Sequence, residues 1–106
     1  MKQRSEPLPP RDASATFRAL ARALASLGDP REVAAFLEDL CTPAELRSMA
    51  DRWRVAKLLD QGLSYRVINE KTGVSTATIT RVARSLTYGT GGYRMVLQRQ
   101  EGESSE

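Results

Sequence analysis

The sequence predicts an all-α protein that carries a helix-turn-helix segment, and three observations support this. Thirteen of its 106 residues are Ala, the strongest helix former. Apolar residues recur at intervals of three and four along most of the chain, and no useful stretch alternates between apolar and polar residues as a strand would. Helix-capping signals separate these apolar stripes, so we expect several short amphipathic helices.

An all-helical dimerisation and helix-turn-helix domain is predicted over residues 12–99. The preceding arm, residues 1–11, has three Pro and four charged residues, a composition that favours flexibility. Beyond it, a narrow apolar stripe with helical spacing is formed by Phe17, Leu20, Leu24 and Leu27. Gly28 ends this helix.

The next two helices each begin with a capping signature. Asp29-Pro30-Arg31-Glu32 predicts an N-cap, a Pro at the first helical position and a capping-box Glu. Thr42-Pro43-Ala44-Glu45 repeats this signature one helix later. The third helix is expected to end at Gln61-Gly62.

Residues 64–86 carry the clearest signal, two helices joined by a tight turn. Ser64 and Ser75 can each cap a helix, and Gly73 supplies the left-handed residue that ends the first of the two. The corner between such helices needs apolar residues, and these are present as Ile68, Val74, Ile79 and Val82. This spacing predicts a helix-turn-helix.

The outer face of the second helix has small or basic side chains and no acidic one. Small residues let a helix approach the floor of the major groove, and Arg can bind guanine edges or phosphates. A hairpin in a helical bundle with solvated surface charges is the alternative. The predicted DNA-binding residues are Arg66, Asn69, Lys71, Ser75, Thr76, Ala77, Thr80, Arg81 and Arg84.

The charge distribution agrees with a polyanion partner. Residues 42–99 hold ten basic and four acidic side chains, whereas residues 1–41 hold six of each. A surplus of basic side chains favours nucleic-acid binding, because Lys and Arg that neutralise phosphates release condensed counterions. The acidic tail, residues 100–106, has no apolar side chain and is predicted to be disordered.

Several function classes are disfavoured by composition. The chain has no His and one Cys, which removes the common hydrolytic dyads, imidazole metal ligands and an intrachain disulfide. No apolar run exceeds five residues, so we expect neither a signal peptide nor a membrane-spanning helix. These features predict a cytoplasmic protein that is not an enzyme and has no catalytic residues, metal site or cofactor.

The apolar content is low for an independent core. Leu, Ile, Val and Phe number 12, 2, 6 and 2, which is 22 of 106 residues. Small domains bury a smaller fraction of their surface than large ones, so a second copy of the chain is the natural source of further core. We therefore expect a homodimer.

Several motifs resemble the tryptophan repressor family over about residues 33–97. They are Leu40-Cys41-Thr42-Pro43 with Glu45, then Arg52, Ser64 with Arg66, Ala77-Thr78-Ile79-Thr80-Arg81, and Ser85-Leu86. The closing run from Ser85 to Tyr93 is similar to the YerC/YecD group of that family.

The resemblance implies a six-helix intertwined homodimer with two outward helix-turn-helix heads. The last helix would begin near Gly92 and contribute Tyr93, Val96 and Leu97. A pseudo-palindromic operator would have half-sites about 34–36 Å apart.

In this family a corepressor lies between the third helix and the recognition helix. The matching positions here are Thr42, Arg52, Arg81 and Ser85. A family glycine that leaves room for indole is replaced by Val82, so we expect a carboxylate smaller than tryptophan if an effector binds.

The sequence therefore predicts a homodimeric transcriptional regulator, a repressor by resemblance, that binds double-stranded DNA. The alternative is a helix-turn-helix used for protein–protein interaction without specific DNA readout.

Overall fold

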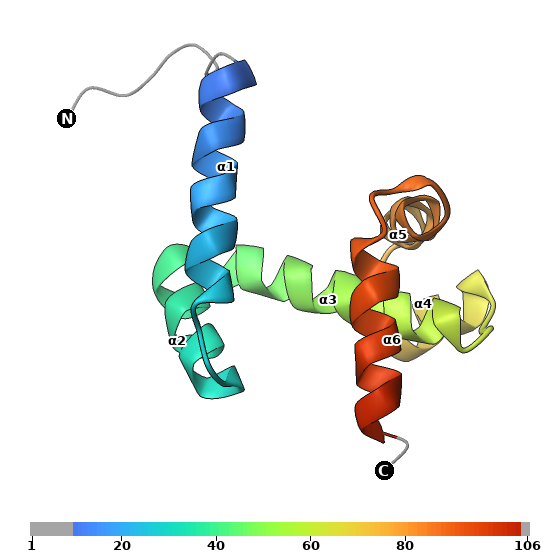
Figure 1. The fold of residues 1–106 in the computed structure, drawn as a ribbon. Helices are drawn as coiled ribbons and strands as arrows, with labels where there is room; N and C mark the ends of the chain where they lie inside the picture. Colours follow the sequence, from blue (N-terminus) through green and yellow to red (C-terminus); the bar gives the residue numbers. More distant parts are fainter. Residues whose placement is uncertain (1–9, 105–106) are drawn as a thin grey trace. The chain divides into compact units, whose positions relative to one another are not determined.

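A computed structural model describes residues 10–104, over which the chain forms six helices and no strand (Figure 1). The all-α prediction is confirmed. The helices are α1 (Pro10–Ala25), α2 (Pro30–Leu40), α3 (Pro43–Asp60), α4 (Tyr65–Thr72), α5 (Thr76–Tyr88) and α6 (Gly92–Ser104).

The outermost helix bounds differ from the prediction. The helix α1 begins at Pro10, two residues before the predicted helical domain, because the fixed φ of Pro suits a first helical position. The helix α6 continues to Ser104, through most of the predicted disordered tail. Gln100 and Glu101 favour helix, and they let α6 propagate past residue 99. The rest of the predicted arm and tail, 1–9 and 105–106, lies outside the described residues.

The chain divides into two compact units, residues 1–40 and 41–106. In the first unit, the predicted N-cap of α2 is confirmed, since the Asp29 carboxylate accepts the backbone N–H groups of Arg31 and Glu32 at 2.8 and 3.1 Å. The capping-box interaction is displaced by one residue. The Glu32 carboxylate accepts the N–H of Gly28 at 2.6 Å, one position before the cap.

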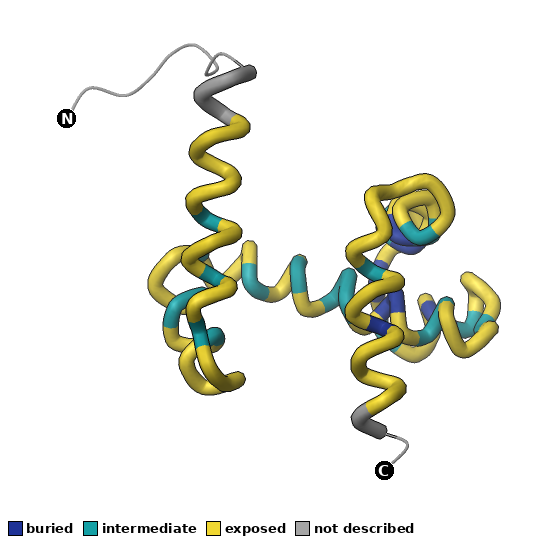
Figure 2. The backbone as a smooth tube through the Cα atoms, in the orientation of Figure 1, coloured by how far each residue is buried: buried dark blue, intermediate teal, exposed yellow. Residues whose placement is uncertain are grey.

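The first unit has no core of its own in a single chain. Among the side chains described between Ser14 and Leu40, none is buried (Figure 2). Phe17, from the predicted stripe of α1, is 68% exposed. The amphipathic stripes were predicted correctly as sequence patterns, but this unit alone does not cover them.

The second unit contains the core. Its helix α3 packs against α4, α5 and α6, and α5 packs against α4 and α6. At its start, Thr42 and Glu45 form the predicted capping box, with bonds of 3.1 and 2.7 Å. Gln61 caps its end, and Gly62 follows with a left-handed φ of 87°.

Buried side chains lie where the helices of the second unit meet (Figure 2). All four predicted corner residues belong to this core, which confirms the apolar spacing around the turn. The buried residues are Val55, Ala56, Ile68, Val74, Ile79, Val82 and Leu97. Trp53 and Tyr93 are half-buried and pack against them.

Candidate nucleic-acid interface

The two helices α4 and α5 are held by caps at each side of a short turn. Ser64 Oγ accepts the N–H of Val67 at 3.2 Å, and Ser75 Oγ accepts the N–H of Thr78 at 3.2 Å. Between them Gly73 has a φ of 74°, a conformation that costs Gly little. These three predicted roles are confirmed, and together they set the direction in which α5 leaves the turn.

Two side chains of α4 stabilise the turn by hydrogen bonds to its backbone. The amide nitrogen of Asn69 donates to the carbonyl of Val74 at 2.8 Å. The Thr72 hydroxyl donates to the carbonyl of Ile68 at 2.7 Å and accepts the N–H of Val74 at 3.0 Å. Asn69 is a predicted DNA-binding residue, and in this structure its amide group stabilises the turn.

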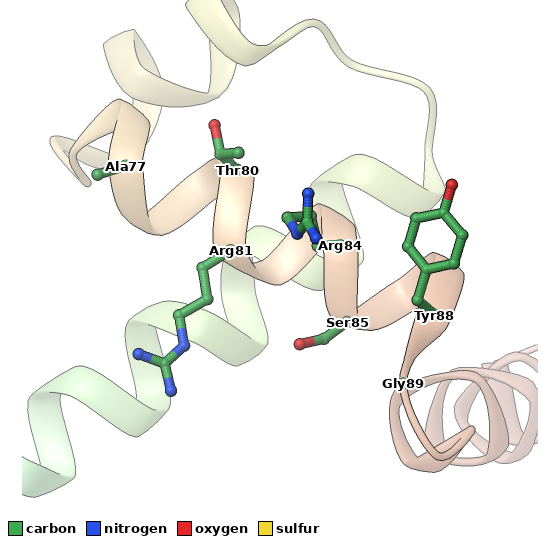
Figure 3. A pocket seen from close by; sticks show the side chains of 7 residues that line it. All are labelled: Ala77, Thr80, Arg81, Arg84, Ser85, Tyr88 and Gly89. Atoms are coloured by element: carbon green, nitrogen blue, oxygen red, sulfur yellow. The ribbon is translucent and has the colours of Figure 1, made fainter.

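The outer face of α5 forms a shallow groove of about 460 Å³ (Figure 3). Three predicted DNA-binding residues, Ala77, Thr80 and Arg84, and the doubly assigned Arg81 are among its lining residues. The full lining is Ala77, Thr80, Arg81, Arg84, Ser85, Tyr88 and Gly89. Neither Asp nor Glu is among them, so the groove has a positive charge.

Within this groove the side chains divide into two sets. Figure 3 shows Thr80, Arg84 and Tyr88 on one side of α5, whereas Arg81 and Ser85 leave the helix in another direction. The remaining predicted residues of α5 and its cap, Ser75 and Thr76, are exposed at the start of the helix.

The sequence prediction omits two groove residues, Tyr88 and Gly89, of which Tyr88 has a side chain that can contact a partner. Its side chain is 79% exposed, although aromatic rings usually lie at least partly buried. The signal was present in the spacing, because Thr80, Arg84 and Tyr88 follow Ala77 at i+3, i+7 and i+11 on one helical face. A polar aromatic side chain at the end of this face extends the candidate interface by one turn.

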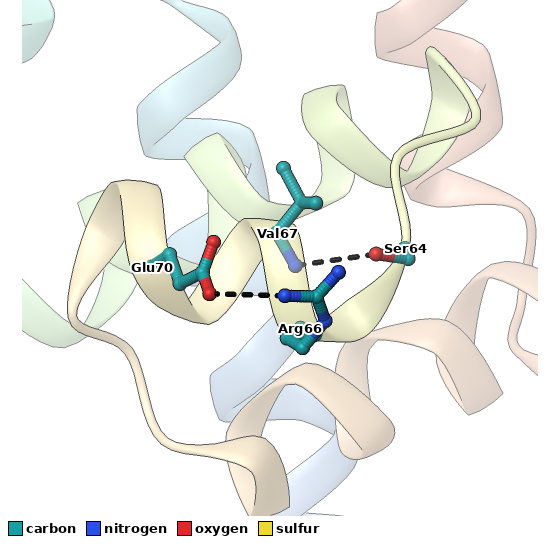
Figure 4. A network of polar contacts seen from close by, with 4 residues as sticks. All are labelled: Ser64, Arg66, Val67 and Glu70. Carbon is teal, nitrogen blue, oxygen red and sulfur yellow. Dashed lines mark hydrogen bonds and ion pairs between the residues drawn. The ribbon is translucent and has the colours of Figure 1, made fainter.

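Arg66 pairs with an acidic neighbour on α4 (Figure 4). Its Nη1 lies 3.3 Å from Oε2 of Glu70, and the two side chains are 80% and 60% exposed. The sequence prediction includes Arg66 among the DNA-binding residues and does not include Glu70. Lys71, the other basic residue of this helix that is predicted to bind DNA, is exposed in the last turn.

The four predicted ligand residues do not line one common groove in a single chain. Arg81 and Ser85 line the groove on α5, whereas Arg52 lines another of about 450 Å³ along the first half of α3. Thr42 caps α3, and ten residues of helix separate it from Arg52 by about 15 Å. Within this unit of a single chain, the grooves therefore do not bring all four residues to one ligand.

Val82 is part of the core instead of facing a ligand slot. Its side chain is 1% exposed and lies in the cluster with Val55, Ile68 and Ile79. The residue that replaces the family glycine therefore fills space between α5 and its neighbours. The expectation that Val82 narrows the space for an indole ring stays a prediction.

Two further properties concern membranes and metals. Within residues 10–104, none of the helices is long and apolar enough to span a bilayer. In the same described part of the chain, Cys and acidic side chains do not gather in a group of three that could hold a metal ion.

The comparisons with known proteins all point to one family. The family model of the Trp repressor protein matches residues 15–101. The uncharacterized protein YerC of Bacillus subtilis (strain 168) is 44% identical over 87 residues, which cover 82% of this chain and 84% of YerC.

Two crystal structures are also similar. One is a TrpR-like protein from Eubacterium eligens ATCC 27750, with a TM-score of 0.77, 46% identity and coverage of 82% of this chain and 90% of that one. The other, from Staphylococcus aureus, is provisionally described as a Trp repressor, with a TM-score of 0.78, 41% identity and coverage of 82% and 87%. The family model and these relatives each match most of the chain, and the chain therefore belongs to the Trp repressor family.

Proposed function

We propose that this protein is a transcriptional regulator that binds specific double-stranded DNA through a helix-turn-helix formed by α4 and α5. One observation carries the proposal: the outer face of α5 is exposed, positively charged and free of acidic side chains along its groove. Membership of the Trp repressor family, a family of DNA-binding regulators, supports the same function.

The proposed contacts follow from the position of each side chain along α5. Ala77 and Thr80 are small enough to approach base edges, where a methyl group can contact thymine and a hydroxyl group can hydrogen-bond. Arg84 supplies a charge for phosphate or guanine. Tyr88 lies eight residues after Thr80, about 12 Å along the helix, which is close to the width of the major groove. We assign Tyr88 to the sugar-phosphate backbone at the groove edge.

The proposal includes a homodimer, and unsatisfied apolar surface supports it. The first unit buries none of its described side chains between Ser14 and Leu40. In the second unit, Trp53, Tyr93 and Val96 line a largely apolar groove of about 650 Å³. A second copy would cover such surfaces, as the family resemblance implies, and would place two α5 helices on one duplex.

In vitro selection from a random duplex library tests this function, because it finds the preferred sequence without a chosen operator. We expect enrichment of a two-fold symmetric sequence whose half-sites are about 34–36 Å apart. Failure of the folded, dimeric protein to enrich or shift any duplex at moderate salt would contradict the proposal. Salt-insensitive capture of a protein partner in that case would favour the protein–protein alternative.

Two variants separate the proposed readout from backbone binding. Thr80→Ala should weaken the selected sequence by about 1–3 kcal/mol and leave random duplex unaffected. Lys71→Ala should weaken both duplexes alike and reduce the salt slope by about one unit. Equal losses on both duplexes for both variants would contradict these assignments.

A small carboxylate effector is a separate proposal, centred on Arg81 and Ser85 because these side chains line the same groove. Arg provides bidentate recognition of carboxylates. Amino and organic acids that raise the melting temperature of the protein would support it, since a ligand specific for the folded state stabilises that state.

A further inference from the structure

Glu70 is unusual in both its sequence context and its position. From residue 61 to residue 100 it is the only acidic residue, whereas the same stretch has six basic ones, Arg66, Lys71, Arg81, Arg84, Arg94 and Arg99. It belongs to α4, the helix that precedes the proposed recognition helix, and its side chain is 60% exposed. Glu70 is therefore the one carboxylate within a basic stretch of the sequence, and it lies on the helix next to α5.

The ion pair of Glu70 with Arg66 contributes little to the stability of α4. Arg66 lies in the first turn of the helix and Glu70 in the last turn, so both charges oppose the helix macrodipole. The order is also unfavourable, since an acidic residue before a basic one at i, i+4 stabilises a helix more than the reverse. Exposed pairs contribute little to folding in any case.

Packing does not explain the pair either. The two side chains are 80% and 60% exposed, and the contact between Nη1 of Arg66 and Oε2 of Glu70 at 3.3 Å lies within one helix. It connects no two elements of the fold (Figure 4). The pair is therefore exposed to charged partners outside the chain, and such a partner would interact with the charge of Arg66.

We propose that Glu70 limits sequence-independent DNA binding by holding Arg66 back from the phosphate backbone. This inference rests on the proposed function and deepens it. Non-specific affinity comes from cations that neutralise phosphates and release counterions. A guanidinium that is already neutralised by a carboxylate contributes no such release, and the carboxylate itself repels phosphate. The base contacts of α5 do not depend on this pair.

The test is Glu70→Gln, measured on a random-sequence duplex over a salt series. Freeing Arg66 adds one phosphate contact, so affinity should rise about fivefold to tenfold at 0.1 M salt and the salt slope should steepen by about 0.9. Glu70→Asp keeps a charge beside Arg66 and should bind like the parent protein. Melting curves establish that each variant is folded.

A matched control removes the same charge elsewhere. Glu101 is exposed on α6, and Glu101→Gln gives the same change in net charge, so it should raise affinity by less than about twofold. Adding Arg66→Gln to Glu70→Gln should reverse the gain and restore the slope.

The outcomes distinguish this inference from the proposed function. If Glu70→Gln and Glu101→Gln bind alike while the parent protein binds DNA, the role of Glu70 is wrong and DNA binding stands. If Arg66→Gln does not reverse the gain, the effect does not act through Arg66 and the inference is also wrong. If no folded variant binds any duplex, the proposed function fails and this inference fails with it.

Discussion

Single residues of the candidate interface separate into those that build it and those that remain available to contact a partner. Asn69 and Ser75 both fit a DNA-binding pattern by type, yet their side chains hydrogen-bond to the backbone at the turn and at the helix cap. Thr80 and Arg84 are exposed along the groove of α5. Residue type alone therefore does not distinguish a structural amide or hydroxyl group from a binding one.

Gly89 shows how one missing side chain positions the end of α5. Its N–H donates to the carbonyl of Ser85 at 2.9 Å, and an added Cβ would overlap that same carbonyl oxygen. We expect Gly89→Ala to destabilise the protein by about 1–3 kcal/mol, because the backbone must shift to relieve the overlap. Urea denaturation measures this effect.

A second glycine provides the control for this prediction. At Gly102, in α6, an added Cβ meets nothing within 4 Å. Gly102→Ala should leave stability unchanged or raise it by up to about 1 kcal/mol, because Ala favours helix. Similar effects of the two substitutions would show that the contact with Ser85 is unimportant.

At the scale of elements, α5 is the structure that the interface depends on. Its buried face, Ile79 and Val82, packs in the core, and this fixes which side chains face outward. Its N-terminus is set by the Ser75 cap, and the turn before it is fastened by Asn69 and Thr72. The position of the candidate binding face thus depends on caps and core packing together.

Removal of the α5 cap should weaken both folding and DNA binding. In Ser75→Ala, the N–H of Thr78 loses its acceptor, and we expect a loss of about 1 kcal/mol in the free energy of unfolding. Ser75→Asn retains a capping oxygen and should restore stability. If the Asn variant is as unstable as the Ala variant, the cap is not the source of the loss.

For the whole molecule, the balance between buried and exposed apolar surface supports the proposed homodimer. The buried core of the described residues belongs to the second unit, and Phe17 of the first unit is 68% exposed. Such exposed apolar stripes are costly in water, and a second copy that covers them would stabilise both units. Folding and association should therefore be coupled.

Coupled folding makes the melting temperature depend on concentration. For a dimer of this chain length, we expect the midpoint to fall by about 3–4 °C for each tenfold dilution, from the usual unfolding enthalpy per residue. Phe17→Asp should lower the midpoint further by placing a charge on the apolar stripe. A midpoint that is independent of concentration, measured by circular dichroism, would contradict the obligate homodimer.

Local signals in the sequence determined the elements of this protein. The caps at Thr42, Ser64 and Ser75 act through neighbouring backbone groups, and the left-handed Gly73 follows from backbone sterics, so both can be predicted from a few residues. Helical periodicity identified the corner residues, because the intervals of three and four that place side chains on the buried face are set within each helix.

Only the tertiary structure decided which of the outward residues lie together. It separated Arg52 on α3 from Arg81 on α5 in different grooves, and it placed Val82 of α5 in the core with Val55 of α3. These relations depend on side-chain direction and on packing between helices that are distant in sequence, and local propensity contains no information about either. The sequence by itself determined the helices and their apolar faces, and packing decided the geometry of the surface they present.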